Sequence, residues 1–177
     1  MKKDIKIAVS GKSGCGNTTV SRMVADKLGL RFINFTFRSL AQEKGITLNE
    51  VLDRAATDDW WDREVDSRQV QLARESGGCV LGSRLAIWML EDADLKVYLT
   101  ASAETRAARI AKREGGSLEA VAAFTAERDR QDRSRYVRIY NIDNDNYQLA
   151  GMVINTDNLE PDAIARMITA EAEKIQE

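Results

Sequence analysis

Short apolar runs alternate along the chain with segments in which apolar residues recur at helical spacing. The runs cover residues 5–10, 31–35, 79–81, 95–100 and 152–155, and their length is typical of buried strands. Apolar residues every three or four positions predict helices over 18–28, over much of 36–75 with a break near Gly45, and over 102–114, 118–140 and 161–176. This alternation predicts an α/β fold: a three-layer, doubly wound parallel sheet of about five strands.

Size and composition favour one domain over 1–177, since 177 residues with a hydrophobic share of 44% can bury their own core. A net charge of −2 gives no general attraction for nucleic acid or an anionic membrane. The absence of histidine excludes His-based metal sites and Ser-His-Asp triads. Two cysteines make no disulfide framework, and no apolar run approaches the roughly 18 residues of a membrane span.

These exclusions lead us to expect a cytoplasmic protein whose partners are small molecules, neither polymeric nucleic acid nor a membrane. The start of the chain, residues 1–4, leads into only a short strand, so no signal peptide is expected. A monomer is expected rather than an obligate oligomer.

The clearest chemical signal is a glycine-rich loop, GKSGCGNT, between the first predicted strand and the first predicted helix. Glycines at 11, 14 and 16 permit backbone torsions that turn successive N–H groups inward at the positive end of a helix. The loop therefore predicts a site for the phosphates of ATP, made by Gly11, Lys12, Ser13, Gly14, Cys15, Gly16, Asn17, Thr18 and Thr19. Thr18 stands where such loops place their Mg²⁺-binding hydroxyl. A plain glycine turn without a ligand is the alternative.

Asn17 stands where these loops carry a lysine, so an amide replaces the charge that normally reaches the β- and γ-phosphates. Lys12, one residue after the first glycine, is a candidate to restore that charge. It resembles an extra lysine at the same offset in some ATPases with variant loops. A solvated surface lysine is an equally open interpretation. A lysine at position 17 is expected to be tolerated.

Arginine is concentrated in one part of the chain: eight arginines and a single lysine lie between residues 106 and 138. A guanidinium binds phosphate oxygens through two parallel hydrogen bonds, so this stretch is suited to closing over phosphates. The candidates for catalysis are Lys12, Arg109, Arg113, Arg128 and Arg135, with Arg130 and Arg133 in support. For any one of these arginines, a solvated helix face with pairs such as Arg128–Asp132 is the alternative.

Further segments, spread over nearly the whole chain, carry a resemblance that none of them would carry alone. They are Phe37–Ala41 with Lys44–Leu48, Arg84–Met89, Ala93–Ala101, the run Glu127–Asp143 with its Arg128, Asp132, Arg135, Tyr136 and Tyr140, and Val153–Thr156. In order and spacing they resemble the cytidylate kinases of the short, archaeal type. Asn17 is the main departure, and the glycine that the family has next to Arg84 is displaced to Gly82.

The resemblance implies a nucleoside-monophosphate kinase that moves the γ-phosphoryl group of ATP to CMP or dCMP, with Mg²⁺ between the phosphates. It implies a helical monophosphate-binding segment over about 36–76 and an arginine-rich lid over about 114–140. It places Arg38 and Arg84 in segments that bind the monophosphate acceptor, and Arg38 would hold the acceptor's phosphate. Structural salt bridges are the alternative for both arginines. Asp66 and Asp132, and less strongly Asp62, are candidates to accept from the cytosine amino group.

Two other functions stay open on the sequence alone. One is a nucleotide-binding sensor that has lost catalysis, which Asn17 favours. The other is a kinase of the same fold for a different small acceptor, such as AMP or shikimate.

Overall fold

The computed structural model describes residues 4–75 and 77–176. Residues 1–3, 76 and 177 lie outside it, and with them the start of the chain and the last residue of the segment expected over 36–76. Within the described residues, the strands form one sheet of five in the order β2-β3-β1-β4-β5, and every neighbouring pair is parallel. They are β1 (Lys6–Gly11), β2 (Arg31–Ile33), β3 (Cys79–Gly82), β4 (Leu95–Thr100) and β5 (Met152–Asn155). The predicted fold class is confirmed.

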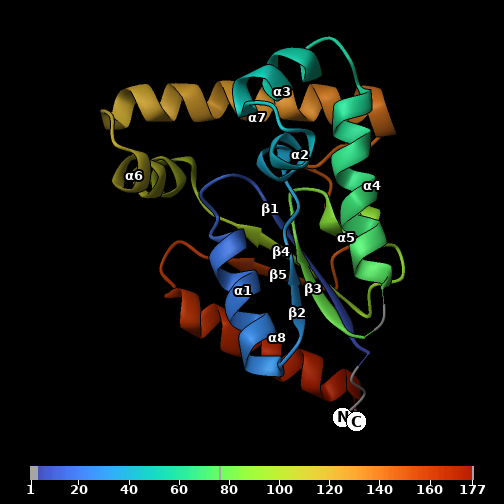
Figure 1. Ribbon diagram of the computed structural model, residues 1–177. Coiled ribbons are helices and arrows are strands. Elements are labelled where there is room, and N and C mark those ends of the chain that lie inside the picture. The colour runs from blue at the N-terminus through green and yellow to red at the C-terminus, as the bar shows by residue number, and fades with distance from the viewer. Residues whose placement is uncertain (1–3, 76, 177) are drawn as a thin grey trace.

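Helices cover both faces of this sheet because successive strand residues point to opposite sides (Figure 1). Ile7 and Val9 of β1 face α1 (Asn17–Leu28) and α8 (Pro161–Gln176) in one buried apolar cluster. Ala8 faces the other cluster, to which α4 (Trp60–Arg74) and α5 (Ala86–Met89) contribute. The sheet is therefore the middle of three layers.

The remaining helices gather at the end of the sheet where the strands finish (Figure 1). They are α2 (Phe37–Lys44), α3 (Leu48–Ala55), α6 (Ala103–Glu114) and α7 (Leu118–Tyr140). A third apolar cluster, which includes Leu40, Val51 and Trp61, packs α2, α3 and α4 together. None of the helices in the described residues is long and apolar enough to cross a membrane.

Local signals in the sequence account for most element boundaries. Gly29 ends α1 in the left-handed conformation with φ 63°, and Asn141 ends α7 in the same way with φ 57°. Thr36 and Thr47 begin α2 and α3 with capping boxes, which split the stretch 36–75 into three helices. The four-residue helix α5 was not predicted, and β2 ends at Ile33 rather than at residue 35.

Asn17, the first residue of α1, joins the ends of two strands. Its Nδ2 donates to the carbonyl oxygens of Val9 (2.9 Å) and Ser83 (3.1 Å), and its Oδ1 accepts from Ser21 Oγ at 3.0 Å. A Cβ at Gly82 would lie 2.7 Å from Ser21 Oγ, so only glycine fits beside this group. The amide at the lysine position is thus used to hold β1, β3 and α1 together.

These hydrogen bonds reverse the expectation that a lysine is tolerated at position 17. A lysine has no acceptor for Ser21, and its ammonium lies two bonds farther from the backbone than the Asn17 NH₂, so it does not fit between the two carbonyl oxygens. Partly buried groups left without partners cost about 1–3 kcal/mol. We predict a loss of that size in the free energy of unfolding, measured by urea denaturation followed by tryptophan fluorescence. Asn158→Lys, at an exposed position, is the matched control and should change stability little. Equal stability of the two variants would contradict this reading of Asn17.

Candidate active site

The glycine loop between β1 and α1 has a backbone that only glycine adopts freely at two positions. Gly14 and Gly16 have φ of 85° and 89°, and a Cβ at Gly14 would lie 2.8 Å from the backbone oxygen of Arg106. The N–H groups of Asn17, Thr18 and Thr19 open α1, where a helix has no partners of its own for its donors. With the positive end of the helix dipole, these groups form an anion-binding site.

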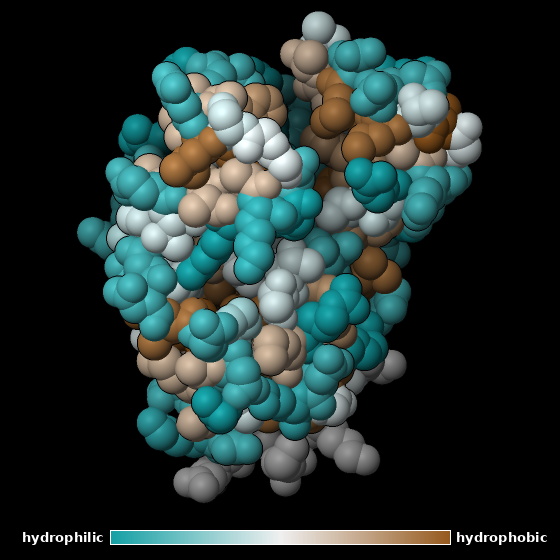
Figure 2. All heavy atoms as spheres, turned by 90° about the vertical axis from the view of Figure 1, so that its left-hand side faces the viewer, coloured by the Kyte–Doolittle hydropathy of each residue, from teal (hydrophilic) through white to brown (hydrophobic). Residues whose placement is uncertain are grey.

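The loop forms one wall of a cavity of about 600 Å³ at the carboxyl ends of the strands. The molecular surface is hollowed between two lobes at this end (Figure 2). Of the residues proposed from the sequence, the cavity is lined by Gly11, Lys12, Ser13, Gly14, Gly16, Asn17, Thr18, Thr19, Arg38, Asp62, Asp66, Arg84, Arg113, Arg128 and Arg135. Residues from the loop, α2, α4, α6, α7 and the end of β3 therefore meet in one space.

Three of the proposed residues lie behind the cavity wall instead. Cys15 is 2% exposed and its N–H donates to Lys12 O, so it offers a ligand neither its side chain nor its N–H. Burial raises the pKa of its thiol. Arg109 donates to Gly14 O at 3.2 Å and to Thr156 O at 2.5 Å, and thereby braces the loop from outside. Asp132 is buried and serves as a counter-ion to arginines.

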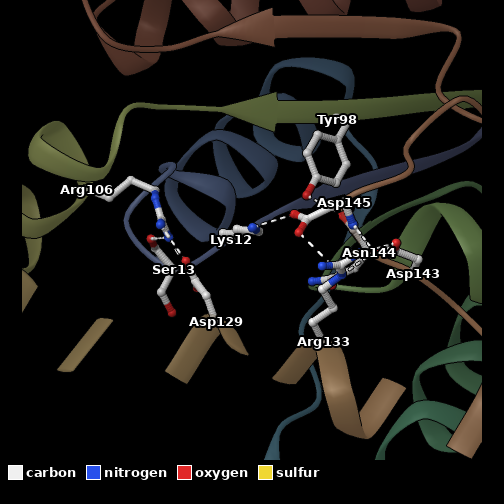
Figure 3. A network of polar contacts seen from close by, with 9 residues as sticks. All are labelled: Lys12, Ser13, Tyr98, Arg106, Asp129, Arg133, Asp143, Asn144 and Asp145. Atoms are coloured by element: carbon white, nitrogen blue, oxygen red, sulfur yellow. Dashed lines mark hydrogen bonds and ion pairs between the residues drawn. The ribbon is translucent and has the colours of Figure 1, made fainter. Parts of the chain in front are cut away.

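Lys12 is engaged in an ion pair at the edge of the site. Its Nζ lies 2.5 Å from Asp145 Oδ1, in the segment that follows α7 (Figure 3). Arg133, from α7, binds the neighbouring Asp143 at 2.6 Å and 2.8 Å. Tyr98 OH donates to Asn144 O at 3.0 Å and anchors the same segment to the sheet. A ligand in the loop would therefore compete with a carboxylate for the Lys12 charge.

Ser13, at the tip of the loop, is held from two sides by arginines. Arg84 at the end of β3 donates to Ser13 Oγ at 2.6 Å. Arg106 of α6 donates to Ser13 O at 3.1 Å (Figure 3). Each arginine also meets a carboxylate of α7: Asp132 at 3.2 Å from Arg84, and Asp129 at 2.5 Å from Arg106. The sequence indicated an arginine-rich region here but did not single out Arg106 or Asp129.

Arg128 of α7 lines the cavity close to a second arginine, Arg84. Burial, and then the nearby charge of Arg84, lower the pKa of Arg128, which shows that its cation is destabilised in this environment. An anion beside Arg128 would relieve this cost. Arg113, by contrast, is an exposed side chain at the rim, paired with Glu114 at 2.5 Å.

A polar stripe on α4 forms the wall of the cavity on the side of α2 and α3. Asp62, Asp66 and Gln69 recur at i, i+4 and i+7 and line the cavity together. Asp62 Oδ1 accepts from Arg135 Nε at 3.0 Å, and Asp66 Oδ2 accepts from Tyr140 OH at 2.6 Å. Gln69 was missed in the sequence, although its helical spacing from the two aspartates was a readable signal.

The fold and the loop together define a P-loop protein of the α/β kinase class. Among solved structures the chain is similar to shikimate kinase from Acinetobacter baumannii in complex with shikimate, with a TM-score of 0.67 over 98% of this chain and 95% of that one. The identity of 17% carries this likeness only to the level of the fold.

The chain belongs to the cytidylate kinase-like family, whose model matches residues 6–158. It is 46% identical over 174 residues to cytidylate kinase 2 from Borreliella burgdorferi, covering 96% of each chain. It is 41% identical over 173 residues to cytidylate kinase from Pyrococcus horikoshii, covering 96% of this chain and 90% of that one. The family resemblance found in the sequence is confirmed.

Because Asp66 is partly buried in the cavity wall, its ionisation lowers the free energy of unfolding. Burial raises its pKa to about 6, against the 3.8 of an ordinary aspartate, so the folded state holds the proton more tightly than the unfolded state. Stability is therefore lost as pH rises from about 4 to about 6. We predict that Asp66→Asn is more stable than the parent by about 1–2 kcal/mol at pH 7.5, with the difference gone near pH 4.

Urea denaturation at both pH values measures this difference. Asp53→Asn, an exposed carboxylate of α3, is the control and should give no such pH-dependent gain. A gain from Asp66→Asn that is the same at both pH values would show that the charge of Asp66 is not its source.

Proposed function

We propose that this protein is an ATP-dependent nucleoside-monophosphate kinase that transfers the γ-phosphoryl group of ATP to CMP or dCMP, giving ADP and CDP or dCDP. The observation that carries the proposal is that the phosphate-binding loop, the arginines and the polar stripe of α4 line the same cavity. Membership of the cytidylate kinase-like family supports the same acceptor. We take residues 1–177 as one domain, with a monophosphate-binding segment over about 36–76 and a lid over about 114–140.

The phosphates of ATP would bind the free N–H groups at the start of α1. Thr18, the second residue of that helix, is exposed at the cavity wall and fits the position of a Mg²⁺-binding hydroxyl. Mg²⁺ held there would neutralise charge on the β- and γ-phosphate oxygens. Gly14 and Gly16 give the loop the positive φ angles of 85° and 89° that turn its backbone toward the phosphates.

Phosphoryl transfer requires in-line positioning and charge neutralisation, with little covalent help from the protein. We assign the neutralisation to Lys12 and to the arginines that line the cavity, Arg84, Arg113, Arg128 and Arg135. Arg109 and Asp132 become positioning residues, because Arg109 supports the loop and Asp132 holds Arg84 and Arg135. On this assignment the amide at position 17 does not by itself imply a sensor without activity.

At the acceptor end we assign Arg38, from α2, to the phosphate of CMP. Asp66, with Asp62 behind it, would accept hydrogen bonds from the amino group of the base. The apolar side chains of Phe37, Leu48 and Leu52 line the same end of the cavity and suit a planar base. Closure of this segment and of the lid would exclude water from the transfer.

The proposal is tested by incubating the protein with ATP, Mg²⁺ and one acceptor at a time: CMP, dCMP, UMP, AMP or shikimate. We expect CDP and dCDP to form with the highest kcat/KM. A folded protein that binds ATP and makes no diphosphate would favour the sensor instead, and preference for AMP or shikimate would favour a different acceptor.

The role of Lys12 gives a second test. A cation at the transferred group can be worth about 10³–10⁵ in rate when an arginine finger supplies it, so we predict that Lys12→Ala lowers kcat at least about 100-fold. Lys174→Ala on α8, far from the loop, is the control. Full activity of Lys12→Ala would contradict this role and assign the charge to the arginines alone.

Asp145→Asn removes the carboxylate that competes with the phosphates for Lys12. It should therefore lower the Kd for ATP about threefold to tenfold, as measured by calorimetry.

A further inference from the structure

Gln69 lies in the wall of the cavity with an orientation that its contacts determine. The residue is 4% exposed and lines the cavity from α4. Its side chain is 2.6 Å from the carbonyl oxygen of Phe35. A carbonyl oxygen can only accept, so the group that meets it is the NH₂, and the side-chain oxygen must point elsewhere. That oxygen, Oε1, has no hydrogen-bond partner among the described residues.

The stripe of α4 that carries Gln69 holds buried acceptors without hydrogen-bond partners in the chain as the structure describes it. Asp66 precedes Gln69 by three residues, which places the two Cβ atoms about 5–6 Å apart on one helix face. Tyr140 OH already donates to Asp66 Oδ2. Asp62, two turns earlier, has a buried Oδ2 that also lacks a partner within the part of the chain that is described. Buried acceptors are rarely left unpaired, so this wall is suited to a ligand that brings N–H donors.

We infer that Gln69 is a specificity-determining residue whose Oε1 accepts a hydrogen bond from the exocyclic amine of the acceptor's base. This inference rests on the proposed function and names the group that distinguishes the bases. The cytosine amine has two N–H donors, one for Gln69 Oε1 and one for Asp66. Uracil carries a carbonyl oxygen at the same place, so two hydrogen-bond acceptors would face each other and Gln69 Oε1 would stay without a donor.

Asp66 and Gln69 of α4 have different roles because only one of them titrates. Asp66 exchanges a proton near neutral pH and can present either a donor or an acceptor. The Gln69 amide does not titrate and is fixed by Phe35, so it presents an acceptor at every pH. Gln69 thus sets which base is accepted, while Asp66 strengthens the bond to it.

A purely structural role for Gln69 makes a different prediction. In that case the side chain serves only to tie the connection between β2 and α2 to α4 through Phe35 O. Its loss would lower stability and reduce activity toward all acceptors by a common factor. Discrimination between cytosine and uracil is therefore the measurement that separates the two roles.

The test compares kcat/KM for CMP and UMP in Gln69→Met, which keeps the length of the side chain and removes its oxygen. Gln71→Met, at an exposed position two residues along the same helix, is the matched control. We expect the CMP:UMP ratio to fall at least tenfold in Gln69→Met and to stay within twofold of the parent in Gln71→Met. Equal losses toward CMP and UMP in Gln69→Met would overturn the inference.

Gln69→Glu separates the bond to Phe35 from the bond to the base. It keeps an acceptor in the wall but weakens the contact with Phe35 O when ionised, so stability should fall while the preference for CMP stays within about threefold of the parent. A Gln69→Glu protein that has lost the preference as fully as Gln69→Met would contradict the inference. The CMP analogue with hydrogen in place of the amino group provides a second comparison. The ratio of kcat/KM for CMP to that for this analogue should be smaller in Gln69→Met than in the parent, because only the bond to Asp66 remains.

Failure of the inference is distinguishable from failure of the proposed function. A parent protein that makes no CDP contradicts the function, and calorimetric Kd values for CMP and UMP then supply the same ratio. If Gln69→Met does not fold, nuclear magnetic resonance of the parent decides. Its Gln69 side-chain amide signals should shift with CMP and much less with UMP, and identical shifts with both nucleotides would overturn the assignment.

Discussion

The hydrogen bonds of Asn17 are the constraint from which the rest of the site follows. One amide binds the ends of β1 and β3 and the first turn of α1, and Gly82 leaves room for it. The glycine loop therefore starts from a rigid base. The same bonds turn the side chain at this position toward the sheet, so the cation that such loops usually place there has to come from other residues.

The arginines around the glycine loop divide into those that hold the loop and those that line the cavity. Arg106 and Arg109 bind backbone oxygens of the loop, and they hold Ser13 and Gly14 in place. Arg84 does both, since it meets Ser13 and also lines the cavity. Asp129 and Asp132 of α7 bind Arg106 and Arg84 from the far side, so ion pairs connect α7 to the loop.

The sequence predicted the fold and the loop because both depend on local patterns. Strand length, helical spacing and capping residues such as Gly29 and Thr36 act over a few neighbours, and the structure places them close to expectation. The orientation of long polar side chains depends instead on partners that lie far away in the sequence. Arg109 does not line the cavity because it binds Thr156, which lies 47 residues later in the chain. Lys12 likewise pairs with the distant Asp145. Gln69 could have been found by its spacing, but its free oxygen became evident only once Phe35 was seen to occupy its NH₂.

The central claim is that Lys12 and the arginines supply the charge that position 17 no longer carries. A crystal structure with a bisubstrate analogue joining adenosine and cytidine through phosphates tests it most directly. We predict Lys12 Nζ within about 2.7–3.2 Å of a phosphate oxygen and released from Asp145, with Asn17 still bound to Val9 and Ser83. Asn17 swung out to the phosphates, with Lys12 still paired to Asp145, would contradict this account.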